Sequence, residues 1–146
     1  MDEIKKTQIQ LKNKLSDLAK LTDELTLFFT KKYEFLINPV NLILEELYSN
    51  SINYGKSEVV QINIVLDVKL DLLTIIYEDN GIAFNPLSAQ TKLDLSTSIE
   101  ESEIGGLGIH LIKSMTDTQF YKRYNDKNQL TLEKKLTQKA TNHAQH

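Results

Sequence analysis

The sequence predicts an α+β fold, a two-layer α/β sandwich in which helices pack on one face of a sheet. Two observations lead to this prediction. Segments with helical periodicity are grouped apart from the strand-like segments, and the latter follow one another in pairs that are separated by short polar turns. Alternation with a period of two is typical of a strand with one buried face, and a short connection joins two strands antiparallel. Segregated helices and antiparallel strands indicate an α+β sandwich rather than a doubly wound sheet.

The first half of the chain is predicted to contain a strand and two helices. Residues 4–11 intersperse apolar and polar side chains, which favours an opening strand. A helix is expected over residues 16–33, with the serine at its first position as N-cap. The dipeptide Asn38-Pro39 begins the second helix, since proline is tolerated in the first turn, and Gly55 ends it as the C′ residue.

A hairpin and a long loop are expected next. Residues 60–68 and 70–78 are rich in alternating β-branched residues and predict two antiparallel strands. From residue 79 to residue 103 no periodicity is sustained, one helical turn after Pro86 excepted. Loops of this length tend to be lids or binding loops, so we expect residues 88–103 to form a mobile lid.

The last part of the chain is predicted to contain a helix and a second hairpin. The helix spans residues 106–115, and the strands span residues 118–124 and 129–136. Almost no apolar residue follows, which favours fraying. We therefore expect one domain over residues 1–136 and a disordered C-terminal tail over residues 137–146.

The composition excludes several kinds of site and partner. The chain has no cysteine, which excludes disulfides, Cys-ligated zinc, iron–sulfur clusters and thiol catalysis, and which fits a reducing cytoplasm. Its three histidines argue against a His-rich metal site, and its net charge of −3 gives no general attraction to nucleic acid or anionic membranes. The polar start predicts no signal peptide, and no apolar run reaches bilayer length. We expect a cytoplasmic protein without direct nucleic-acid or membrane contact.

A first polar cluster lies on the second helix. Glu46, Asn50 and Asn53 are spaced i, i+4 and i+7 and share one helix face. A carboxylate and an amide oxygen one turn apart suit a hard cation and an acceptor for a proton. The alternative is a solvated face of an amphipathic helix, which on the pattern alone is the more common explanation.

A second cluster lies where a strand ends on Asp79-Asn80-Gly81. A carboxylate at a strand end accepts a hydrogen bond from an amino group of a ligand, and glycine lets the ligand approach the backbone. The alternative is a hairpin turn on Asn-Gly, which is disfavoured because no clear partner strand follows directly.

A third cluster is a glycine-rich stretch at the start of the third helix. Gly105, Gly106 and Gly108 flank Leu107, and the exposed N–H groups of such a helix start form an anion site, most naturally for phosphates. The alternative is a flexible hinge. Gly108 inside the first turn costs about 1 kcal/mol against alanine, which close approach of a phosphate explains and a hinge does not.

The order and spacing of the three clusters resemble those of the GHKL ATPases, a superfamily that includes gyrase-type ATPases and histidine-kinase catalytic domains. Three sequence boxes, called N, G1 and G2, carry the resemblance: Glu46-x-x-x-Asn50, Asp79-x-Gly81-x-Ala83 and Gly105-Gly106-Leu107-Gly108. The resemblance implies a Bergerat-type ATP-binding fold with a mixed, mostly antiparallel sheet. Within the superfamily, residues 79–86, 106–117 and 121–136 resemble the anti-sigma-factor serine-protein kinases of bacterial partner-switching systems.

The resemblance implies a role for each box. Asn50 would bind Mg²⁺ between the phosphates of ATP, and Glu46 would be the general base that deprotonates a serine or threonine of a partner protein. Asp79 would accept a hydrogen bond from the adenine amino group. The other cofactor-binding positions would border the adenine or contact phosphates: Gly81, Ala83, Gly105, Gly106, Leu107 and Gly108.

The resemblance also implies partners. The protein would be a serine/threonine-protein kinase and anti-sigma factor that phosphorylates a STAS-type anti-sigma-factor antagonist and sequesters a sigma factor or similar regulator, as a homodimer. One alternative is a nucleotide-loaded switch that sequesters a partner without transferring phosphate. Glu46 favours the kinase, because a pure binder needs no base. Two others are less favoured: a detached histidine-kinase catalytic domain, which usually has asparagine in place of Glu46, and a gyrase-like or chaperone module, which needs a transducer domain.

Overall fold

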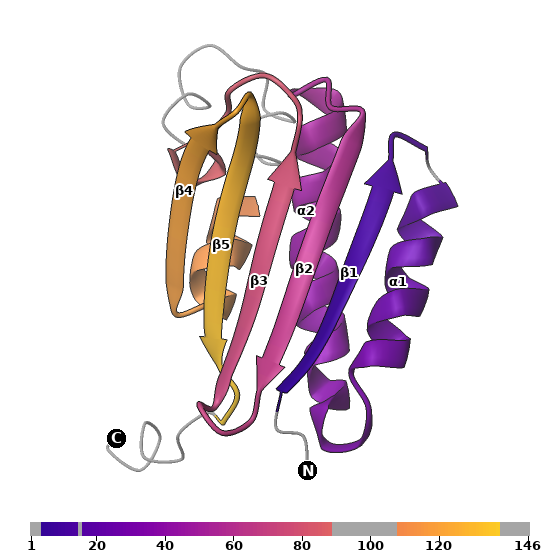
Figure 1. Cartoon of the computed structure of the whole chain (residues 1–146), viewed down its shortest axis with the longest axis vertical. Coiled ribbons are helices and arrows are strands. Elements are labelled where there is room, and N and C mark those ends of the chain that lie inside the picture. The colour runs from indigo at the N-terminus through magenta and orange to yellow at the C-terminus, as the bar shows by residue number, and fades with distance from the viewer. Residues whose placement is uncertain (1–3, 15, 89–107, 138–146) are drawn as a thin grey trace.

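The computed structural model describes residues 4–14, 16–88 and 108–137, and Figure 1 shows their arrangement. The elements follow in the order β1 (Ile4–Lys12), α1 (Ser16–Phe28), the 3₁₀ helix η1 (Lys31–Leu36), α2 (Ile37–Asn53), β2 (Val59–Asp67), β3 (Leu72–Asp79), β4 (Thr118–Tyr124) and β5 (Lys127–Lys135). A further helix at residues 108–115 precedes β4, and residues 86–88 form a 3₁₀ turn, as expected after Pro86.

The five strands form one sheet in the order β1-β2-β3-β5-β4. All four pairings among them are antiparallel, whereas the resemblance implied a mixed sheet. The reason is that two helices separate β1 from β2. The two helices together return the chain to the end of the sheet where β1 finished, so β2 runs back beside it (Figure 1).

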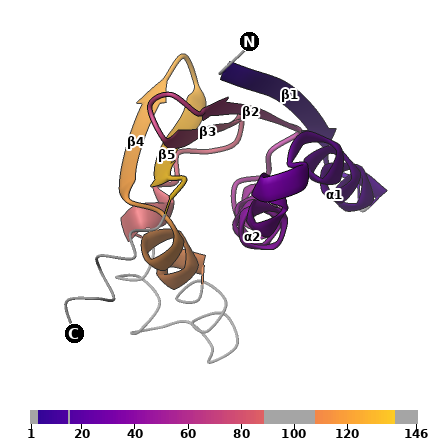
Figure 2. The same cartoon turned by 90° about the horizontal axis from the view of Figure 1, so that it is seen from below.

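The molecule has two layers, which confirms the α+β class. Figure 2 shows α1, α2 and the helix at residues 108–115 on the same side of the sheet. Every second residue of β2 and β3 is buried against this layer, as the alternation predicted. Leu21 and Leu25 of α1 and Leu44 of α2 are fully buried in the same core. Within the described part of the chain, no helix is long and apolar enough to cross a membrane.

The first helix ends earlier than predicted. It stops at Phe28, not at residue 33, because Thr30 is extended and Lys31 has a φ of 55°. A left-handed residue cannot continue a right-handed helix. The chain turns there into η1, which continues directly into α2 at Ile37, one residue before the expected start.

Left-handed residues also shift two turns. The loop between β2 and β3 extends to Asp71, whose φ is 57°, so β3 begins at Leu72. At the end of α2 the left-handed residue is Lys56, with a φ of 55°, and not Gly55. Gly55 is needed for space instead, because a Cβ there would lie 2.9 Å from the carbonyl oxygen of Ser51.

The last hairpin is tighter than predicted. Asn125 and Asp126 have φ values of 48° and 60°, so they form a two-residue turn, and β5 begins at Lys127, two residues before the expected start. Positive φ at both positions is the signature of a type I′ turn. Most of the expected lid and most of the expected tail lie outside the described residues; Thr137 itself donates a hydrogen bond to Asp71.

We expect the substitution Asp126→Gly to stabilise the protein. Glycine adopts the left-handed conformation without a Cβ penalty, and Asn-Gly is the preferred type I′ sequence. The free energy of unfolding in urea, followed by circular dichroism, should rise by up to about 1 kcal/mol. The control Lys127→Gly, within β5, should lower it. A loss of stability in Asp126→Gly would contradict the assigned turn.

Candidate functional site

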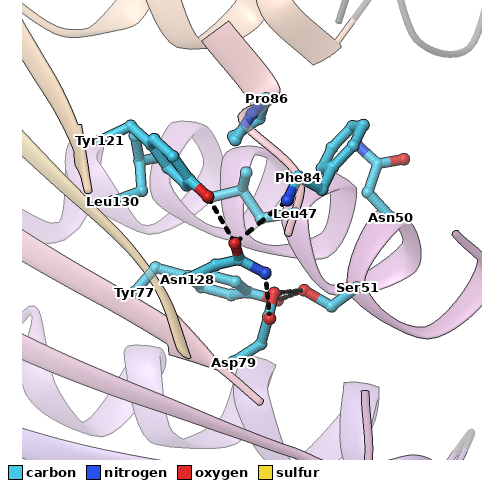
Figure 3. A pocket seen from close by; sticks show the side chains of 10 residues that line it. All are labelled: Leu47, Asn50, Ser51, Tyr77, Asp79, Phe84, Pro86, Tyr121, Asn128 and Leu130. Carbon is cyan, nitrogen blue, oxygen red and sulfur yellow. Dashed lines mark hydrogen bonds between the residues drawn. The ribbon is translucent and has the colours of Figure 1, made fainter. Parts of the chain in front are cut away.

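A small cavity lies between α2 and the ends of β3 and β5, beneath the segment that follows β3 (Figure 3). Ten residues line it: Leu47, Asn50, Ser51, Tyr77, Asp79, Phe84, Pro86, Tyr121, Asn128 and Leu130. Its free volume is about 20 Å³, which is room for about one water molecule. Any larger ligand must displace part of this lining.

Asp79 is the buried carboxylate of the cavity. It is the last residue of β3, faces the helices and is 8% exposed. Its Oδ2 accepts a hydrogen bond from the hydroxyl of Ser51 at 2.6 Å, and its Oδ1 accepts from the backbone N–H of Gly81 at 3.0 Å and from Nδ2 of Asn128 at 2.8 Å. All three donors are neutral. A carboxylate has about four acceptor sites, so one remains for a hydrogen-bond donor of a ligand.

Tyr77 fixes the direction of this network. Its hydroxyl lies 2.7 Å from Oγ of Ser51, whose single proton is given to Asp79, so Tyr77 is the donor of that pair. Burial raises the pKa of Tyr77 well above its ordinary value, and the negative charge of Asp79 raises it further. The phenol therefore stays protonated and keeps donating.

Asn128 joins the two sides of the cavity and was missed as a site residue by the sequence analysis. It lies opposite Asp79 in the register of β3 and β5. Its Nδ2 also donates to the carbonyl of Ile82 at 2.8 Å, and its Oδ1 accepts from the N–H of Phe84 and the hydroxyl of Tyr121. All donor and acceptor sites of the amide are used. Through these hydrogen bonds, Asn128 holds residues 82–84 against β5.

One sequence signal points to Asn128. In β5 every second residue is buried, and Asn128 shares this periodicity with Leu130 and Leu132. A polar residue at a core position of a strand requires internal hydrogen bonds. Ser51, at a buried position of α2, carries the same signal.

Local packing also explains why residue 81 is a glycine. A Cβ there would lie 2.4 Å from the carbonyl oxygen of Gly55 and 2.4 Å from Oγ of Ser57. The next residue, Ile82, donates its N–H to the carbonyl of Gly55 at 2.9 Å. Gly81 therefore lets the segment after β3 pack on the loop after α2. Neither Gly81 nor the exposed Ala83 lines the cavity.

Glu46 and Asn50 are two further buried acceptors on α2. Oε2 of Glu46 and Oδ1 of Asn50 are both buried and have no hydrogen-bond partner. This excludes a solvated polar face as the explanation of these two residues. Asn53, the third member of the predicted face, is exposed and does not join them. Figure 3 shows Asn50 beside the Asp79 network but outside it.

Gly108 lies directly against Glu46. A Cβ on Gly108 would lie 2.6 Å from Cγ and 2.8 Å from Oε2 of Glu46, so a larger residue at position 108 would require the Glu46 side chain to move. Burial raises the pKa of Glu46 above its ordinary value, which makes its carboxylate a stronger proton acceptor. The other predicted phosphate contacts, Gly105, Gly106 and Leu107, lie outside the described residues.

The site is suited to a magnesium ion that is bound jointly by the protein and by a ligand. Residues 4–14, 16–88 and 108–137 contain no cluster of three or more His, Cys, Asp or Glu that would hold a metal alone. Mg²⁺ is usually bound through one or two protein oxygens together with substrate phosphates and water. The unpartnered oxygen of Asn50 is suited to this role, and that of Glu46 lies one helical turn away.

Comparison with known families gives a match over most of the chain. The model of the family described as histidine kinase-like ATPase domain matches residues 12–134, a range that includes every residue of the site. A comparison with curated proteins found no match.

We expect Glu46→Gln to raise the thermal unfolding midpoint of the ligand-free protein at pH 7. A carboxyl group whose folded pKa is raised favours folding below its unfolded pKa of about 4.5, and this contribution is lost as pH rises through the folded pKa. Glutamine does not ionise, so the variant does not lose stability as the pH rises through the folded pKa of Glu46.

The stabilisation by Glu46→Gln should therefore shrink as the pH is lowered towards 4, where the wild-type carboxyl is protonated. Glu45→Gln, one residue earlier on α2, is the control and should show no such pH dependence. A wild-type protein more stable than Glu46→Gln at pH 7 would show instead that favourable contacts hold the Glu46 carboxylate.

Proposed function

Because the chain belongs to the histidine kinase-like ATPase domain family, we propose that its cavity binds the adenine of ATP and that the protein is a serine/threonine-protein kinase. The single observation that carries the proposal is the Asp79 carboxylate, which is buried, held by neutral donors and left with one acceptor site at the cavity.

The chemistry of the cavity favours adenine over guanine. An acceptor at the base-recognition point pairs with an amino group, which adenine has at its six position and guanine lacks there. Leu47, Phe84 and Leu130 supply apolar walls for the flat ring. A buried acceptor that is left unpaired costs free energy, so a base without the amino group is rejected.

The α2 residues support phosphoryl transfer at the adjoining position. Asn50 would hold Mg²⁺, which supplies charge neutralisation for the phosphates, and Gly108 of the helix at residues 108–115 lies against the Glu46 side chain at the same place. Asn50 thereby orients the phosphates relative to Glu46.

Glu46 is suited to act as the general base. Its Oε2 has no partner and its pKa is raised by burial, so it accepts a proton from the hydroxyl of a substrate serine or threonine. The hydroxyl oxygen forms a bond to the γ-phosphorus, the bond from that phosphorus to the β–γ bridging oxygen breaks, and ADP leaves. The carboxylate gains the proton and ATP supplies the phosphoryl group.

The protein substrate follows from the sequence resemblance. The run at residues 79–86 and the glycine-rich helix resemble the anti-sigma-factor kinases, which supports a STAS-type antagonist as substrate and a sigma factor or similar regulator as the sequestered partner of a homodimer in the cytoplasm. The alternative is a nucleotide-loaded switch without kinase activity. The phosphotransfer experiment below distinguishes it from this proposal.

Asp79→Asn should abolish ATP binding without unfolding the protein. Asparagine can keep its oxygen towards Gly81 and Asn128 and donate its amide to Ser51, so the network survives with one reversed bond. The cavity then presents a donor to the adenine amino group.

Isothermal titration calorimetry should show a loss of ATP affinity of at least about tenfold in Asp79→Asn, since a hydrogen bond to a charged group contributes about 1.5–3 kcal/mol. Glu78→Gln, on the opposite face of β3, is the control and should bind ATP like the wild type. Unchanged ATP affinity in Asp79→Asn would remove the adenine assignment.

Glu46→Gln and Asn50→Ala should fail at different steps. Removal of the Asn50 oxygen should weaken nucleotide binding only when Mg²⁺ is present. Glu46→Gln should bind ATP normally but transfer phosphate about 10²- to 10⁴-fold more slowly, because the base acts only on the incoming hydroxyl.

The measurement is transfer from radiolabelled ATP to STAS proteins encoded in the same genome. Glu45→Gln is the matched control, because Glu45 accepts a hydrogen bond from Asn41 and points elsewhere on α2. Near-wild-type transfer by Glu46→Gln would show that Glu46 is not the base. Absence of transfer by the wild type, with tight binding of the partner, would indicate the switch.

A further inference from the structure

A second, larger cavity lies at the opposite end of the sheet from Asp79. β1 begins and β2 ends there, since Ile4 pairs with Asp67 while Val60 pairs with Asp79 at the other end. The cavity is a groove of about 390 Å³ between these strand ends and the turn that joins α1 to η1. Ligand pockets for small molecules have volumes of about 300–1,000 Å³. Nothing in the proposed kinase reaction uses this groove.

The walls of the groove are mostly apolar. Phe28 and Tyr33 contribute from the helical layer, and Leu66 and Val68 contribute from the end of β2. Val68 is 41% exposed although it is large and apolar. Apolar surface that lines a concavity can be removed from water by the apolar part of a ligand.

Three lysines and no carboxylate line the same groove: Lys5, Lys31 and Lys32. Nζ of Lys5 donates to the carbonyl of Phe28 at 2.6 Å and lies 5.1 Å from the centre of its ring. Nζ of Lys32 lies 5.4 Å from the ring centre of Tyr33. The groove lining thus carries three positive charges in a chain of net charge −3. Its electrostatic preference is for an anion.

The backbone conformation of Lys31 influences the position of this lysine at the groove. Lys31 has a φ of 55°, a conformation that favours glycine or asparagine and that lysine rarely adopts. The same conformation ends α1 and turns the chain into η1. Here the conformation places a lysine at the mouth of an apolar groove.

We propose that this groove binds a small organic anion with an apolar body, such as a medium-chain fatty acid. The apolar body would lie against Phe28, Leu66 and Val68, and the carboxylate would contact the ammonium groups of Lys31 and Lys32. Both parts of the ligand are required, because the lysines alone are exposed and screened by salt, and the apolar wall alone does not select charge.

The test is isothermal titration calorimetry of the full chain with decanoate below its micellar concentration. The wild type should bind decanoate saturably, at one site, and at least about tenfold more tightly than decanol or decyltrimethylammonium. Saturating ATP with Mg²⁺ should not displace decanoate, because the two sites lie at opposite ends of the sheet. Absence of saturable decanoate binding, or equal binding of decanol, would overturn the proposal.

Variants locate the site. The double variant Lys31→Asn with Lys32→Gln should weaken decanoate binding at least about tenfold, and asparagine tolerates the left-handed conformation at position 31. Val68→Glu, in a surface turn, should weaken it as well by placing a carboxylate in the groove. Lys6→Gln is the matched control, since Lys6 lies on the opposite face of β1. Unaltered binding in both groove variants would overturn the assignment.

Discussion

The site depends on the burial of one carboxylate without a positively charged partner among the described residues. Asp79 receives hydrogen bonds from α2 through Ser51, from the segment after β3 through Gly81 and from β5 through Asn128. A buried charge that loses such donors costs several kcal/mol, so these three parts of the chain are held in one arrangement. The need for donors explains a serine inside α2 and an asparagine at a core position of β5. The acceptor site left over makes the network a recognition element.

The part of the site on α2, formed by Glu46 and Asn50, lowers the stability of the ligand-free protein. Oε2 of Glu46 and Oδ1 of Asn50 are buried without partners, and each such atom destabilises the ligand-free protein. A cation with phosphates, and a hydroxyl to be deprotonated, would supply the missing interactions. Because Asn50 and Ser51 are adjacent on α2, the helix links the base-recognition end of the site to the phosphate end.

Periodicity predicted the layers and the strands. Local spacing and a strand end also singled out Glu46, Asn50 and Asp79 as candidate site residues, and the structure places Asn50 and Asp79 at the cavity. The ends of the elements were harder to predict, since Lys31 and Asp71 are left-handed residues without the glycine that normally signals them. The role of Asn128 depends on a partner 49 residues away, and no local pattern contains that information. Gly81 was singled out as a residue that lets a ligand approach, but its close approach to Gly55 is a tertiary contact that the sequence does not show.

The base preference of the wild type and of Asp79→Asn, measured by calorimetry with ATP and with inosine triphosphate, tests the role of Asp79 most directly. Inosine carries an oxygen where adenine carries the amino group, so it presents an acceptor to position 79. The wild type should prefer ATP by at least about tenfold, and Asp79→Asn should reverse the preference. Equal affinities of the wild type for the two nucleotides would contradict the claim that the Asp79 carboxylate reads the base.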